Sequence, residues 1–149
     1  SMDTPMSQGT RCRQLAEYVV FESPLNMLCD SPTNYDREEE CTEFIATIPT
    51  VWEQTIAMNG EIGKYITMAR RKGDVWYVGS LTNWDARTLT LDLSFLGAGR
   101  WKAEMFHDGV NANRLASDYQ KTVTDIPASR KLTVKMAQGG GCALKIYKE

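Results

Sequence analysis

Few residues of the types that bind zinc or act as nucleophiles occur in this chain, and they are scattered. There are four cysteines, none in a CxxC pair, and a single histidine, His107. Because zinc sites combine Cys and His ligands at short, recurring spacings, this distribution argues against a zinc centre. The cysteines could pair in an oxidising compartment, in a pattern that the sequence does not specify. Cys142 alternates with Leu144 and Ile146, so we interpret it as a small buried hydrophobe.

His107 and the glycine run at 139–141 are the next candidates for chemistry. His107 falls in Met-Phe-His-Asp-Gly, at the end of an expected strand, and no serine or cysteine partner pattern accompanies it. We interpret it as a structural hydrogen-bonding group. The three glycines join two expected strands and do not open a helix, so they predict a turn and not a phosphate-binding loop.

The densest carboxylates are the three glutamates at 38–40. Acid–base catalysis needs carboxyl groups held within reach of one substrate, whereas consecutive residues of a helix point in different directions. We therefore interpret this run as the solvated start of a helix. Glu22, which precedes Ser-Pro at the end of another expected helix, is interpreted as a capping or packing residue.

The four tryptophans raise a binding function of another class. Sugars stack on exposed aromatic faces, so a β-domain with tryptophans is a candidate carbohydrate-binding module. Trp76 and Trp101 lie within alternating strands and are interpreted as core or interface residues. Trp84 lies in a turn, where exposure is expected. No aromatic cluster is visible in the sequence, and sugar binding stays an alternative function.

Composition and charge exclude several partners. Apolar residues make up 42% and charged residues 24%, which is typical of a globular domain. The net charge is −2, with 17 basic and 19 acidic residues, so the basic surface of a nucleic-acid binder is missing. No apolar run approaches the roughly 20 residues that cross a membrane, and we expect neither a nucleic-acid nor a membrane partner.

The chain centres on residues 74–94, where side-chain character alternates at period two twice, around a polar turn at 83–87. Alternation gives each strand one apolar face that a second layer must cover. The stretch predicts a β-hairpin, or two consecutive strands, at the heart of an antiparallel domain. We set aside residues 1–8, which we interpret as a tag remnant and lead-in.

Two different patterns flank a boundary near residues 47–50. Before it, a helix at 9–22, a short buried strand at 25–29 and a helix at 36–46 follow the rhythm of a βα-repeat protein. One strand cannot form a parallel sheet, so residues 9–48 resemble the end of a larger α/β domain. After it, short segments with turn signals such as Asn59-Gly60 predict about eight antiparallel strands in a β-sandwich over 49–149. These segments are 50–58, 64–71, 75–82, 87–93, 100–106, 119–125, 132–136 and 142–147.

Several ordered blocks of the chain resemble the C-terminal part of glycoside hydrolase family 97. These blocks are GTRCRQLAEYVVFESPLNMLCDSPTNY, CTEFIATIPTVWEQT, ARRKGDVWYVGSLTNWDARTLTLDLSFLGAG and MAQGGGCALKIYK. The resemblance implies a parent enzyme with an N-terminal β-sandwich, a catalytic (β/α)8 barrel and a C-terminal β-sandwich associated with oligomerisation. By this resemblance, residues 9–21 correspond to the seventh helix of the barrel, residues 25–29 to its eighth strand and residues 36–46 to its eighth helix.

The resemblance also implies an activity that this chain does not carry by itself. Family members are α-glucosidases and α-galactosidases that use calcium, and are found in the periplasm or exported. Their catalytic glutamates and calcium-binding carboxylates belong to parts of the enzyme that this chain lacks. We therefore expect an inactive accessory and oligomerisation domain, without a catalytic or metal-binding residue of its own, beside a parent that cleaves terminal α-linked oligosaccharides.

Asp30 is the one candidate substrate-binding residue. It follows the expected strand at 25–29, and residues just past the C-terminal end of a barrel strand line the active site of that fold. In the intact enzyme Asp30 is thus expected at the substrate mouth, although an aspartate before Ser-Pro is also a common turn residue.

The two helices of residues 9–48 would contact the rest of the barrel in the parent. Without it, their apolar faces must fold against the sandwich, mispack or be buried against another copy, because large apolar patches seldom stay exposed. We expect a homo-oligomer mediated at least partly by residues 9–48.

Overall fold

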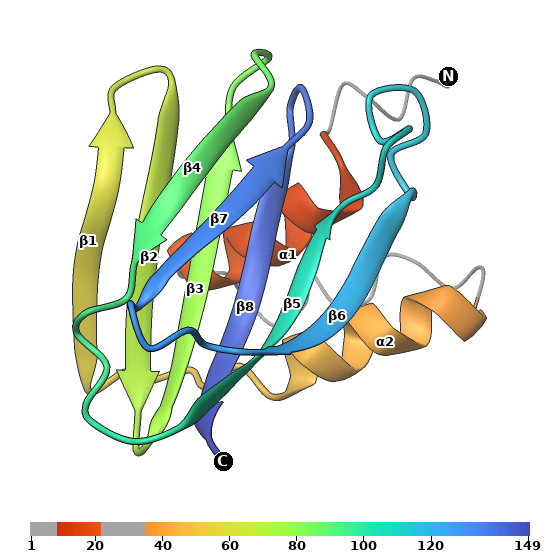
Figure 1. Ribbon diagram of the computed structural model, residues 1–149. Helices are drawn as coiled ribbons and strands as arrows, with labels where there is room; N and C mark the ends of the chain where they lie inside the picture. Colours follow the sequence, from red (N-terminus) through yellow and green to blue (C-terminus); the bar gives the residue numbers. More distant parts are fainter. Residues whose placement is uncertain (1–8, 22–34) are drawn as a thin grey trace.

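The computed structural model describes residues 9–21 and 35–149, so the strand predicted at 25–29 lies outside the described residues. Two antiparallel sheets and two helices form three layers, with the larger sheet in the middle (Figure 1). In chain order the elements are α1 (Arg11–Val20), α2 (Tyr35–Ala46), β1 (Gln54–Glu61), β2 (Tyr65–Lys72), β3 (Val75–Thr82), β4 (Arg87–Asp92), β5 (Trp101–Asp108), β6 (Tyr119–Asp125), β7 (Lys131–Met136) and β8 (Gly141–Lys148). The predicted mainly β fold with a helical N-terminal part is confirmed.

The larger sheet has six strands in the order β1-β2-β3-β8-β5-β6, and β4 pairs with β7 in the smaller sheet. Strands β3 and β4, which the sequence predicted as a hairpin or as consecutive strands, are consecutive but do not pair. The turn at 83–87 instead carries the chain from one sheet to the other. The alternation at period two predicts strands, but it does not say which strand pairs with which.

The first strand differs from its prediction at both ends. Asn59-Gly60 lies inside β1, next to a β-bulge between Ala57 and Asn59, and not in a turn. The turn to β2 follows at 61–64, where the amide of Lys64 donates to the carbonyl of Glu61 at 2.8 Å. Gly63 supplies the positive φ, 78°, that this turn needs at its third residue.

Strand β3 is buried on both faces, although the sequence predicted one apolar face to be covered. Trp76 and Val78 pack between the two sheets, in a core with residues of β4, β7 and β8. Tyr77 and Leu81 point to the opposite face and pack under the helices. The middle position of β3 in a three-layer structure therefore explains why its polar Ser80 and Thr82 are buried too.

Helix α1 is joined to the sandwich at both ends. At its start, Thr10 caps the helix by accepting from the amide of Arg13 at 3.1 Å. The amides of Thr10 and Arg11 donate to Gly139 and Ala116, in loops of the sandwich. At its end, the buried Arg70 of β2 donates to the carbonyl of Val20 at 2.9 Å, where a cation also suits the helix dipole. Loops and strands of the β-domain thus satisfy groups that a free helix leaves unpaired.

The apolar face of α1 lies very close to the larger sheet. Its buried residues are Cys12, Leu15, Ala16, Val19 and Val20. A Cβ atom on Gly79 of β3 would lie 2.7 Å from the carbonyl oxygen of Ala16, and one on Gly141 of β8 would lie 2.8 Å from Cα of Arg13. Both distances are shorter than a real Cβ contact. The helix can therefore sit at this depth only because both positions are glycine.

Helix α2 packs beside α1 on the same face, through a cluster of aromatic rings. Phe44 lies 5.9 Å from Tyr77 and 5.1 Å from Phe106, measured between ring centroids. The hydroxyl of Tyr77 donates to the carbonyl of Thr47 at 2.8 Å, just past the helix end. Of the three alternatives for the helical faces, packing against the sandwich is the one found.

Candidate functional site

The residue predicted to bind substrate, Asp30, lies outside the described residues, as does Glu22. Of the glutamate run, Glu39 is exposed, as expected of a solvated helix start. Glu40 is not: its Oε1 accepts a hydrogen bond from the hydroxyl of Tyr119 at 2.8 Å. That carboxylate therefore holds α2 to β6, a role that an acidic run in the sequence does not reveal.

Within residues 9–21 and 35–149, no group of three His, Cys, Asp or Glu side chains is placed to hold a metal ion. A calcium ion takes six to eight oxygen ligands, several of them carboxylates. The described residues thus do not fit the calcium site that the resemblance implies for the parent. Nor is any described helix long and apolar enough to cross a membrane.

Asp108, at the end of β5, is a partly buried carboxylate with several backbone partners. Its Oδ2 accepts from the amide of Ala137 at 2.8 Å and from the amide of Gly141 at 3.2 Å. Burial raises the pKa of Asp108, although hydrogen bonds from Thr10 and these two amides oppose the rise. Asp108 therefore fixes the glycine turn between β7 and β8 next to the start of α1. The neighbouring His107 is half-buried.

The cysteines near Asp108 are buried thiols. Cys12 and Cys142 are free thiols, and both are buried, as is Cys41. The burial of Cys142 confirms its interpretation as a small hydrophobe. Burial raises the pKa of Cys12 and of Cys142, and the charge of Asp108 adds to the effect. Because the thiolate is the reactive form, these thiols are suited to packing and not to nucleophilic chemistry.

Three of the four tryptophans are occupied by packing. Trp76 lies against Phe95 at 4.5 Å between ring centroids, and Trp52 lies against Tyr77 at 5.5 Å. Trp101 is buried and donates to the carbonyl of Gly97 at 2.9 Å. Trp84 is 54% exposed, as predicted from its turn, and its ring covers Gly139. A sugar-binding platform built from several aromatic rings is therefore not found among these tryptophans.

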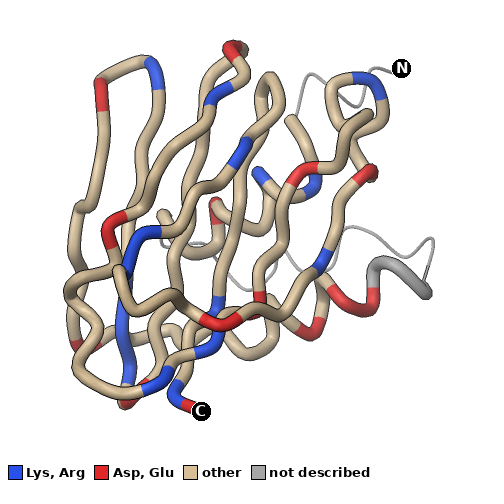
Figure 2. Tube along the Cα trace, in the orientation of Figure 1, with Lys and Arg blue, Asp and Glu red and all other residues tan. Residues whose placement is uncertain are grey.

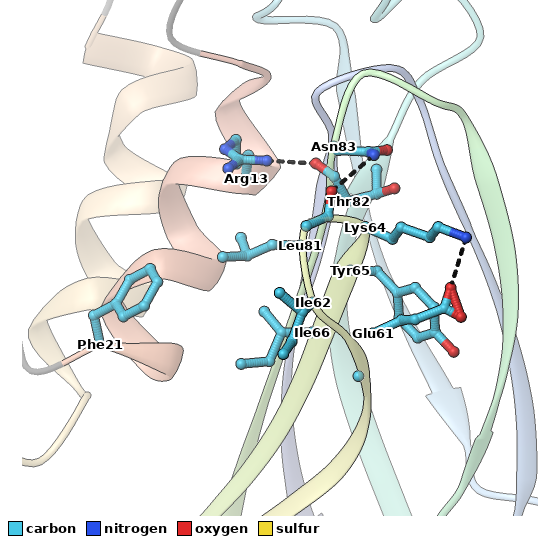
Figure 3. Close-up of a pocket in the computed structure, with 12 residues that line it drawn as sticks. Arg13, Phe21, Glu61, Ile62, Lys64, Tyr65, Ile66, Leu81, Thr82 and Asn83 are labelled. Carbon is cyan, nitrogen blue, oxygen red and sulfur yellow. Dashed lines mark hydrogen bonds and ion pairs between the residues drawn. The ribbon is translucent and has the colours of Figure 1, made fainter.

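A groove runs between α1 and the turn from β1 to β2, and it is a candidate binding site (Figure 3). Its volume is about 480 Å³. We call it the α1 groove; its lining residues are Arg13, Phe21, Gly60, Glu61, Ile62, Gly63, Lys64, Tyr65, Ile66, Leu81, Thr82 and Asn83. The inner wall is apolar, with Ile66 and Leu81 packed next to α1.

Charged groups of both signs line the rim of the α1 groove. Arg13 donates from Nη1 to the carbonyl of Thr82, which joins α1 to the end of β3. Lys64 forms an ion pair with Glu61, with Nζ 2.9 Å from Oε1, and both side chains are more than half exposed. Charges of both signs are also interspersed along most of the chain (Figure 2). The groove is therefore an apolar site with a mixed rim, and it offers no pair of converging carboxylates.

The fold and this surface define a class of protein first: a small β-sandwich domain with helices covering one sheet. The family can then be identified, because a family model described as "Glycosyl-hydrolase 97 C-terminal, oligomerisation" matches residues 51–147. The chain belongs to glycoside hydrolase family 97, and these residues are its C-terminal oligomerisation domain. The resemblance that the sequence blocks indicated is confirmed.

Individual relatives agree with this assignment. A retaining alpha-galactosidase of Bacteroides thetaiotaomicron is 61% identical over 142 residues, which are 95% of this chain and 22% of that protein. A probable retaining alpha-galactosidase of Streptomyces bingchenggensis is 29% identical over 96 residues, 64% of this chain and 15% of that protein. The chain thus spans at most about a fifth of the length of these relatives.

Solved structures show the same fold. A glycoside hydrolase family 97 enzyme from Pseudoalteromonas sp. strain K8, in complex with acarbose, superposes with a TM-score of 0.82 and 37% identity. The match covers 94% of this chain and 23% of that enzyme. A beta-arabinopyranosidase superposes with a TM-score of 0.71 at 25% identity, over 93% of this chain and 21% of that enzyme.

Variants of Asp108 separate its hydrogen bonds from its charge. Asp108→Ala leaves the amides of Ala137 and Gly141 without an acceptor, and should lower the free energy of unfolding by about 2–4 kcal/mol. Asp108→Asn is the matched control, because its amide oxygen can take the place of Oδ2 and accept both bonds. We expect it within about 1 kcal/mol of wild type at neutral pH. Urea unfolding followed by tryptophan fluorescence measures both variants.

The charge of Asp108 should appear in the pH dependence of the same experiment. Because burial raises its pKa, the folded state binds more protons than the unfolded state between the ordinary aspartate pKa and the raised value. Its contribution to stability therefore falls as the pH rises through that window. Lowering the pH should favour wild type over Asp108→Asn. If Asp108→Ala were as stable as Asp108→Asn at neutral pH, the role of Asp108 as acceptor for the two backbone amides would be contradicted.

Proposed function

We propose that this chain is the non-catalytic C-terminal part of an enzyme that cleaves terminal α-galactosidic bonds with retention of configuration. The observation that carries the proposal is the 61% identity to a retaining alpha-galactosidase over 95% of this chain. The family 97 enzyme solved with acarbose is less similar, at 37% identity, so the name of the more similar alpha-galactosidase guides the proposed substrate. The part described here contributes a rigid sandwich and no converging carboxylates, so the reaction takes place elsewhere in the longer enzyme.

The same proposal has consequences for the contact with the barrel, for calcium binding and for localisation. The remainder of the barrel is expected to meet the chain on the side of α1 and α2, since the resemblance equates both with barrel helices. Calcium, where the longer enzyme uses it, is bound by residues outside those described here. Periplasmic or exported localisation also remains part of the proposal, and it rests on the family resemblance alone.

Self-association is the proposed role of the chain itself. The family description supports it. The apolar face of α1 is buried against the sheet. Residues 9–21 therefore offer only a small apolar surface to a second copy, centred on Phe21, which is 53% exposed. The expected homo-oligomer must therefore involve part of the sandwich as well as residues 9–48.

Hydrolysis of p-nitrophenyl α-galactoside and α-glucoside tests whether the catalytic residues lie outside this chain, in the rest of the enzyme. The 149-residue chain should show no turnover, whereas the full-length enzyme, assayed with calcium, should cleave the galactoside faster than the glucoside. The physical reason is that glycoside hydrolysis needs two carboxyl groups facing each other across the scissile bond. Turnover by the chain alone would place a catalytic pair among its residues and refute the proposal.

Asp30 is proposed to lie at the substrate mouth of the full-length enzyme. Asp30→Ala in that enzyme should lower kcat/KM for the galactoside by about tenfold or more, the loss expected when a polar substrate contact is removed. Ser31→Ala, next in the sequence, is the matched control and should have a smaller effect. Unchanged kinetics of Asp30→Ala would leave the residue with a turn-forming role only.

A further inference from the structure

The turn at the edge of the α1 groove carries an apolar residue that the fold does not use. Ile62, at the tip of this turn, is fully exposed, at 103% of its reference area. Turn tips favour Gly, Asn, Asp, Pro and Ser, whose conformations or hydrogen bonds suit a reversal of the chain. Since Ile62 makes no buried contact within the described residues, its stability contribution to the monomer is negligible. An isoleucine at this place is better explained by a contact outside the monomer.

A second exposed apolar side chain faces the same groove. Phe21, directly after α1, is 53% exposed and lies across the groove from the turn that carries Ile62 (Figure 3). Between them the inner wall is formed by Ile66 and Leu81. The α1 groove therefore combines a projecting apolar group with an apolar hollow in one small area of the surface.

This combination suits a second copy of the same chain. In a two-fold symmetric interface the same patch meets itself, so it must contain both a projecting and a receiving part. Ile62 projects, and the α1 groove can receive it. The rim also carries both signs of charge, Arg13 and Lys64 beside Glu61, so two patches can meet without opposing only like charges.

We propose that two copies of this chain associate through the α1 groove, with Ile62 of each copy inserted into the groove of the other. The inference rests on the proposed self-association and deepens it by naming the surface. The family description as an oligomerisation domain favours a copy of the chain as the occupant over another part of the same polypeptide. Phe21 lines the receiving wall, which brings residues 9–48 into the interface.

Sedimentation velocity over a concentration series tests the surface with the 149-residue chain. Wild type should sediment as a dimer, and Ile62→Asp should raise the dissociation constant by roughly a hundredfold, because it places a carboxylate in an apolar hollow. Ile62→Leu should keep the dimer. Val110→Asp is the matched control, since Val110 is 92% exposed in a loop away from the groove, and it should leave the dimer unchanged.

The outcomes separate the surface from the function. Thermal unfolding at a protein concentration low enough for both aspartate variants to be monomeric should be the same for the two, because both side chains are exposed in the monomer and dimerisation, which raises apparent stability, is then absent. A wild-type dimer that Ile62→Asp leaves intact would overturn the surface and leave self-association standing. A wild-type chain that is monomeric throughout would overturn both, and would leave the groove to another occupant such as the barrel part of the enzyme.

Discussion

The close approach of α1 to the larger sheet is the constraint on which the rest of the structure depends. Gly79 and Gly141 leave no room for side chains between helix and strands, so the backbone of α1 lies almost directly on β3 and β8. That depth lets Leu15, Val19 and Val20 reach the sheet, and burial of each contributes about 1.5–3 kcal/mol. It also brings Thr10 next to Asp108, so the start of the helix, the end of β5 and the glycine turn before β8 are held together.

Because α1 and α2 cover one face of the larger sheet, they have a structural role in the sandwich as well as in the barrel to which the resemblance assigns them. By resemblance, α1 and α2 belong to a catalytic barrel, yet here they complete the core of the sandwich through the aromatic cluster around Phe44 and Tyr77. Barrel and sandwich would then share these helices as a common layer. Such an arrangement would couple the C-terminal domain firmly to the enzyme, and it leaves the outer face of β4 and β7, together with the edges and turns of the sandwich, for other contacts. The α1 groove lies at one of these places.

Much of the fold could be predicted from the sequence, because alternation and turn residues are local signals. All eight strands were expected within a few residues, and β3 and β6 at their observed bounds. Long-range features were not predictable in the same way. Asp108 precedes a glycine, a pair that is typical of a turn, and its hydrogen-bond partners Ala137 and Gly141 are far away in the sequence. Ile62 lies in the predicted break between the first two strands, but the residues of the turn were wrong. Asn59-Gly60 is the stronger turn signal, whereas pairing with β2 keeps that dipeptide inside β1, next to a bulge. The sequence did contain one local signal of the close approach of α1: Gly79 lies within a strand, where a glycine often marks the place at which another backbone comes near.

Native-state hydrogen exchange of the 149-residue chain tests the central claim most directly. An isolated helix of the length of α1, 10 residues, is marginal in water, so any strong protection must come from its docking on the sheet. If α1 is an integral layer of the sandwich, its amides are protected to nearly the same free energy as those of β3 and β8. Rapid exchange in α1 with full protection in β3 and β8 would show that the sheet is stable without the helix, and would contradict this account.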